Sequence, residues 1–231
     1  MRATERRTAM SLQRSRAWRA ALPLLILGLL GSMATPAVGA PAEESARGVF
    51  RISDLFGNEP PTPVGSSRLV RTDRGLSAKL ETSALTPGDV VTLWWVVFND
   101  PSGCEAGIPQ VSRCGREDAH AGRGGVSPMH AAGGIVDEDG TVEFGAHARV
   151  GDTSRALTGP GLVDPRGAEV ILVIKSHGPK IPHLVSDQMH TFAGGCADQS
   201  DAPPGTPPEL LGEPGPNDCA ELQVSVHSPT S

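Results

Sequence analysis

The chain has 231 residues, a formal net charge of −6, 38% hydrophobic residues, 28 glycines and 21 prolines. This length fits one ordinary domain, and the composition is that of a loop-rich globular protein. No basic run occurs outside the N-terminus, which excludes a basic nucleic-acid-binding protein. No apolar stretch reaches the roughly 18 residues that a membrane-spanning helix needs.

The N-terminus has the pattern of a secretory signal peptide. Arginines between Arg2 and Arg19 precede an apolar stretch at 20–30 and then a run of small residues. This order of basic, apolar and small residues predicts export and cleavage. We expect residues 1–42 to be removed, because cleavage after Ala40 would leave Pro41 directly behind the cut. The mature protein is therefore expected to be secreted or periplasmic.

The first half of the mature chain is predicted to form strands. Residues 43–65 are expected to be an extended lead-in with one short strand near 49–52. Apolar and polar residues alternate at 76–81, which indicates a strand with one wet face. The run VVTLWWVVF at 90–98 is apolar on both faces and predicts a central strand that is covered on both sides. A long loop at 99–125 and a β-hairpin at 134–150, with its turn at 137–140, follow.

The second half adds two strands separated by a long connection. AEVILVIKS at 168–176 predicts another buried strand, and 222–227 alternate as the last one. Between them, 182–191 are the single helix candidate, and 201–217 are a proline-rich loop. We therefore expect an all-β protein whose residues 66–231 form one antiparallel β-sandwich or jelly-roll-like domain.

Four cysteines lie in the part predicted to be exported, and an even number predicts two disulfides. Three pairings are possible. We favour Cys104–Cys114 and Cys196–Cys219, because each pair brackets one glycine- and proline-rich loop. A thiolate metal site is the alternative, disfavoured by the lack of a close C-x-x-C pair.

Several segments together resemble a family of small secreted bacterial proteins of uncharacterised function. The segments are LTPGDVVTLWWVVFNDP, GLVDPRGAEVILVIKSHGP, TFAGGC and CAELQVSVH, within residues 75–227. The resemblance implies a secreted β-rich domain and carries no activity. A fainter similarity, at 173–179, is to the repeat domains of chordin-like extracellular proteins.

The histidines supply the best candidates for metal binding. On a helix at 182–191, the side chains of His183, Asp187 and His190 would share one face and could hold copper or zinc. The alternative is an ordinary solvated face. His177 and His227 each end a predicted strand and could meet at one rim to bind a ligand, or could simply cap the strand ends.

Trp95 is the third candidate for ligand binding. Because Trp94 and Trp95 point to opposite faces of one strand, one of them could floor a ligand groove. The alternative is that both are buried.

These observations support three hypotheses of function. The first is a secreted, disulfide-stabilised binding or structural module for an extracellular or cell-surface ligand. The second is an exported copper or zinc protein that uses surface histidines. The third is an extracellular hydrolase of unfamiliar type, although the common catalytic motifs are missing from the sequence and no catalytic residue is predicted.

Overall fold

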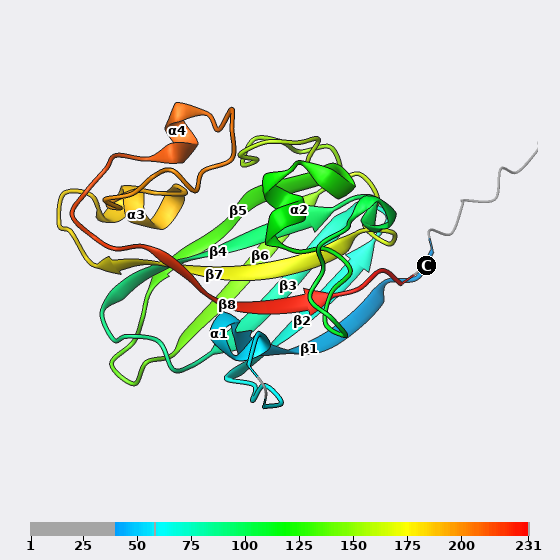
Figure 1. Cartoon of the computed structure of the whole chain (residues 1–231), viewed down its shortest axis with the longest axis horizontal. Helices are drawn as coiled ribbons and strands as arrows, with labels where there is room; N and C mark the ends of the chain where they lie inside the picture. Colours follow the sequence, from blue (N-terminus) through cyan, green and yellow to red (C-terminus); the bar gives the residue numbers. More distant parts are fainter. Residues whose placement is uncertain (1–39, 58, 231) are drawn as a thin grey trace, which may run out of the picture. The chain divides into compact units, whose positions relative to one another are not determined.

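The computed structural model describes residues 40–57 and 59–230, and this part of the chain is an all-β protein (Figure 1). The predicted signal peptide lies almost wholly outside the described residues. The strands are β1 (Glu43–Arg51), β2 (Gly65–Thr72), β3 (Gly75–Thr82), β4 (Asp89–Phe98), β5 (Val126–Ile135), β6 (Val142–Arg149), β7 (Glu169–Pro179) and β8 (Ala220–His227). The short helices are α1 (Ile52–Leu55), α2 (Arg116–His120), α3 (Val185–His190) and α4 (Pro208–Leu211), with 3-10 turns at Pro101–Gly103 and Arg123–Gly125.

The strands form one sheet that nearly closes into a barrel. Their order is β5-β4-β7-β8-β1-β2-β3-β6, and every pairing is antiparallel. β5 and β6, at the two ends of this order, approach each other without forming a ladder. The prediction of an all-β antiparallel fold is therefore confirmed, whereas the sandwich or jelly roll is not, because the molecule is barrel-like.

The connection predicted as a hairpin turn instead joins the two edges of the sheet. The turn itself is present: Gly140 donates to the carbonyl of Asp137 and has a φ of 79°, which favours glycine. Its flanking strands, however, pair with other partners, β5 with β4 and β6 with β3. Local alternation predicts a strand but does not select its neighbour, and here the turn closes the barrel.

The predicted lead-in is also part of the sheet. Residues 43–51 form β1, which pairs with β2 over most of its length and with β8 at Phe50 and Arg51. Its alternating burial escaped detection because glycine and charged residues dilute the pattern. The barrel therefore includes residues well before position 66.

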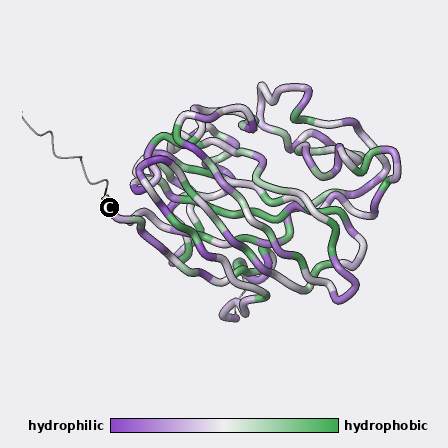
Figure 2. The backbone as a smooth tube through the Cα atoms, turned by 180° about the vertical axis from the view of Figure 1, so that it is seen from behind, coloured by the Kyte–Doolittle hydropathy of each residue, from purple (hydrophilic) through white to green (hydrophobic). Residues whose placement is uncertain are grey.

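The apolar residues form two layers, one on each side of the sheet. The inner core fills the barrel and includes Leu69, Leu80, Trp95, Leu172 and Ile174. A second cluster, here called the outer cluster, lies on the opposite face of β4, β7 and β8. Its buried sheet residues are Trp94, Phe98, Val126, Ile171, Val173, Val224 and Val226. Seen from behind, hydrophobic stretches run along the strands while the peripheral loops are mostly hydrophilic (Figure 2).

Two disulfide-bonded loops cover the outer cluster. The first stapled loop, 99–125, contains α2 and the disulfide Cys104–Cys114; the second stapled loop, 180–219, contains α3, α4 and approaches β8 at the disulfide Cys196–Cys219. These are the two pairings favoured from the sequence. In the described part of the chain, no helix has the length and apolar character needed to cross a membrane.

A buried arginine ties three segments together at one end of the barrel. Arg71 is 1% exposed, and its guanidinium donates to the carbonyls of Pro165, Ala168, His227 and Ser228. Burial lowers the pKa of Arg71 to about 10, so the group is still charged at neutral pH. The arginine thus links β2 to the turn before β7 and to the end of β8.

We expect Arg71→Met to lower the free energy of unfolding by about 3 to 4 kcal/mol, because four carbonyl groups, three of them in buried hydrogen bonds, lose a charged donor. The measurement is urea unfolding at pH 7. Arg68→Met is the matched control: Arg68 lies on the same strand, is exposed and pairs with Glu44. Equal stability of the two variants would contradict the role assigned to Arg71.

Candidate functional site

The outer cluster is incompletely covered, and the uncovered part is an apolar cavity of about 410 Å³. Its floor is the outer face of the sheet, with Val96 and Phe98 from β4 and Ile171 and Val173 from β7. In Figure 1, α2 lies in front of β4 and β7, and α1 lies beside β8. The walls come from these two sides: Ile52, Leu55 and Phe56 at α1, and Ala106, Gly107, Ile108 and Gly115 in the first stapled loop.

The cavity continues in both directions along the sheet. A second hollow, of about 280 Å³, shares Leu55 and Val224 with it and extends past Phe50 and Val226. A smaller hollow of about 50 Å³ shares Val96, Val173 and Glu221 with it and reaches Trp94 and Phe192 of the second stapled loop. The three hollows together are called the groove below.

Charged side chains occur at the rim of the groove. Arg116, at the start of α2, lies 3.0 Å from the carboxylate of Asp201 and 3.9 Å from that of Glu221. This exposed pair joins the two stapled loops and marks the boundary between the large and small hollows. Glu117 adds a further carboxylate to the lining of the large cavity. The groove therefore has an apolar floor and a few polar groups at its mouth, as small-molecule sites commonly do.

One buried carboxylate shapes the wall that the first stapled loop provides. Burial alone would raise the pKa of Asp118, but hydrogen bonds from the backbone of Glu105, Ala106 and Gly115 and from Arg123 lower it to about 2. A second carboxylate, Glu169 of β7, accepts hydrogen bonds from the backbone of Arg113 and Cys114. The loop is thereby fixed to itself and to the sheet.

The structure places the two tryptophans on opposite sides of the sheet, as alternation requires. Trp95 is 1% exposed inside the barrel and does not line the groove. Trp94 faces outward, packs edge-on against His130 and Phe192, and lines the small hollow. Trp94 is itself 3% exposed, so both tryptophans are buried, which is the alternative that the sequence left open.

His177 and His227 do not meet. β7 and β8 run antiparallel, so His227 at the end of β8 lies opposite Val170 near the start of β7, far along the strand from His177. They also face opposite sides: His177 lies under the second stapled loop, whereas His227 contacts Ser45 and Ser67 where β8 separates from β1. Both imidazoles are fully buried and outside the groove.

The predicted metal-binding face is not assembled. The helix begins at Val185, so His183 precedes it, and the three side chains do not share a helical face. Asp187 accepts a hydrogen bond from the backbone of Glu213, and Nδ1 of His190 lies 2.6 Å from the carbonyl oxygen of Ser186. Within the described ranges, the one group of three candidate ligand atoms lying together is His177 with Cys196 and Cys219.

The groove residues escaped the sequence-based prediction, although a signal for them existed. Residues 90–98 and 168–176 are apolar on both faces, and the sequence offered no long helix to cover the second face. Val96, Ile171 and Val173 could have been assigned to that face by alternation from the inward residues. What alternation could not supply is the path of the loops across it.

The chain was compared with models of known protein families and with curated protein sequences, and none of them matches it. The site is therefore interpreted from its geometry and chemistry.

We expect the protein to lose stability as the pH falls from 6.5 toward 4. Burial lowers the pKa of His130 and His177 to about 4 and, together with the nearby charge of Arg71, that of His227 to about 3. As the pH falls, the unfolded chain takes up protons at these histidines before the folded chain does. Each buried histidine therefore lowers the free energy of unfolding by up to about 1.4 kcal/mol per pH unit between 6.5 and its own pKa. Urea unfolding at pH 7.0, 6.0 and 5.0 measures the slope.

His227→Gln should give a flatter dependence than the wild type over the same range, because one of the three protonation sites is gone. His147→Gln, at an exposed histidine on β6, is the control. Identical slopes for the wild type and His227→Gln would contradict the assignment.

Proposed function

We propose that the protein is an exported binding module that holds one small, mostly apolar molecule in the groove. The observation that carries this proposal is the cavity of about 410 Å³ on the outer face of β4 and β7. Its volume lies in the range of small-molecule sites, roughly 300 to 1,000 Å³. Most of its lining is apolar, and its charged residues, Arg116, Glu117 and Glu221, are enough to orient one polar end of a ligand.

Export is supported by two independent features. Residues 1–42 have the pattern of a secretory signal peptide. All four cysteines are paired, and such disulfides form and persist in oxidising compartments. The stapled loops that wall the groove would keep their shape outside the cell because their cross-links are stable there.

The charged residues at the rim of the large cavity indicate which charge the polar end of the ligand can carry. At the large cavity, Arg116 is already engaged by Asp201 and Glu221, whereas Glu117 forms no ion pair among the described residues. Arg47 lines the neighbouring hollow, away from this rim. An apolar body with an uncharged or cationic polar end fits this rim better than an anion, since an anion would meet the surplus carboxylates. We therefore infer an apolar ligand without a negative charge.

The test is binding of N-phenyl-1-naphthylamine, a neutral apolar dye whose fluorescence rises in apolar surroundings. We expect saturable binding to the wild type. Val96→Phe places a ring on the floor of the cavity at a position that tolerates aromatic residues in a strand. It should weaken binding by at least about tenfold, the equivalent of about 1.4 kcal/mol.

Val163→Phe is the matched control, because Val163 is 55% exposed and lies outside the groove. Its affinity for the dye should equal that of the wild type. The proposal fails if the wild type does not bind the dye, or if Val96→Phe folds normally and binds as tightly as Val163→Phe.

A further inference from the structure

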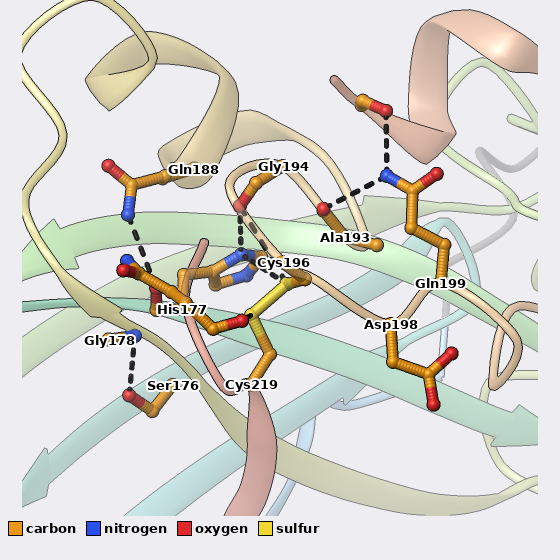
Figure 3. The surroundings of a disulfide bond; sticks show 12 residues. Ser176, His177, Gly178, Gln188, Ala193, Gly194, Cys196, Asp198, Gln199 and Cys219 are labelled. Carbon is orange, nitrogen blue, oxygen red and sulfur yellow. Dashed lines mark hydrogen bonds between the residues drawn. A yellow bond between two sulfur atoms is a disulfide. The ribbon is translucent and has the colours of Figure 1, made fainter. Parts of the chain in front are cut away.

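His177 contacts the Cys196–Cys219 disulfide. Figure 3 shows its imidazole beneath the second stapled loop, directed at the sulfur atoms. Nδ1 of His177 lies 3.7 Å from Sγ of Cys196, and the three possible ligand atoms lie within 4.8 Å of one another. His177 and Cys196 are fully buried, whereas Cys219 is half-buried and gives access from solvent.

One of these separations is that of a tetrahedral zinc site. With Zn–S near 2.3 Å and Zn–N near 2.1 Å, neighbouring ligand atoms lie roughly 3.6 Å apart. The observed separation of 3.7 Å between nitrogen and Sγ of Cys196 already matches this spacing. For both sulfur atoms to act as ligands, the bond between them must break and the two atoms must move apart to the same spacing.

The surroundings of His177 can orient the ring for a metal. Nδ1 now donates to the carbonyl of Gly194 at 2.9 Å, so Nε2 accepts from the hydroxyl of Thr92 at 3.0 Å. The same hydroxyl oxygen accepts from the indole of Trp94. Because a hydroxyl can also accept from Nε2–H, the imidazole can change tautomer. Such an outer hydrogen bond is usual for a metal-bound histidine. The carbonyl of Gly194, which Nδ1 faces at 2.9 Å, must then turn away before Nδ1 can bind a metal.

We propose that reduction of Cys196–Cys219 creates a zinc site made of Cys196, Cys219 and His177. A dithiol reductant supplies two electrons and two protons, the S–S bond breaks, and the reductant leaves as its own disulfide. Zn²⁺ then binds the two sulfur atoms as thiolates, and the two thiol protons pass to solvent. A water molecule supplies the fourth ligand on the side of Cys219, where the site is open.

The metal would replace the disulfide as the cross-link of the second stapled loop. Cys196 belongs to the loop after α3, and Cys219 directly precedes β8. Both the disulfide and the proposed zinc ion would connect Cys196 to Cys219 next to His177 of β7. The module would thereby keep its second stapled loop, and the adjoining end of its groove, under both oxidising and reducing conditions.

The Cys104–Cys114 disulfide of the first stapled loop provides an internal control. Within the described residues, Cys104–Cys114 belongs to no group of three candidate ligands. Its reduction should therefore release thiols without creating a site. Any metal bound after reduction is expected to depend on His177.

The experiment titrates the reduced protein with Co²⁺, a spectroscopic substitute for Zn²⁺, in an oxygen-free buffer. We expect one equivalent to bind, with a near-ultraviolet thiolate-to-cobalt absorption band and tetrahedral visible bands, and Zn²⁺ to displace it. Zn²⁺ should also raise the melting temperature of the reduced protein. The oxidised protein should show none of these changes.

His177→Gln should weaken binding by at least roughly tenfold, because a ligand is lost. His130→Gln is the matched control, since His130 is another buried histidine on the same face of the sheet. The proposal is overturned if the reduced wild type gives no band, if it aggregates although Zn²⁺ is present, or if the two variants bind equally well.

Discussion

The structure depends on one constraint: the strand pair β4–β7 is apolar on both faces. One face fills the barrel with side chains such as Trp95, Leu172 and Ile174, and the other would expose Trp94, Ile171 and Val173 to water. Burying such residues stabilises the fold by roughly 1.5 to 3 kcal/mol each. Without a long helix in the described residues, the covering has to come from loops, and irregular loops need their own fixed contacts.

The two stapled loops meet that need by satisfying buried polar groups. Asp118 and Glu169 accept backbone hydrogen bonds within the first loop, and Gln188 ties the second loop to the carbonyls of His177 and Pro179. A disulfide adds a covalent link in each case. The groove is the part of the outer face that the two loops border but do not fill. Both the proposed binding and the proposed metal site arise from this covering.

The sequence predicted those features that depend on local pattern. Strands β4 and β7, the burial of β4 on both faces and the two favoured disulfide pairings follow from runs of apolar residues and from the loops that the cysteines bracket. Barrel closure could not be predicted, because alternation does not choose a strand's partner. Most of β5 was not predicted as a strand, because Pro128 and two glycines interrupt its apolar pattern. Where His177 and His227 lie depends on the directions of β7 and β8 in the sheet and on the point at which the chain leaves each strand. No local sequence pattern determines either of these.

The central claim is that a small apolar molecule enters the groove, whose main cavity lies between α1 and the first stapled loop. Methyl-selective NMR of valine and isoleucine residues during titration with N-phenyl-1-naphthylamine tests it most directly. The account predicts saturable shifts at Val96, Ile108, Ile171 and Val173, which line the cavity, and none at the exposed Val150 and Val163. Shifts centred on the exposed methyl groups, or none at the cavity, would contradict it.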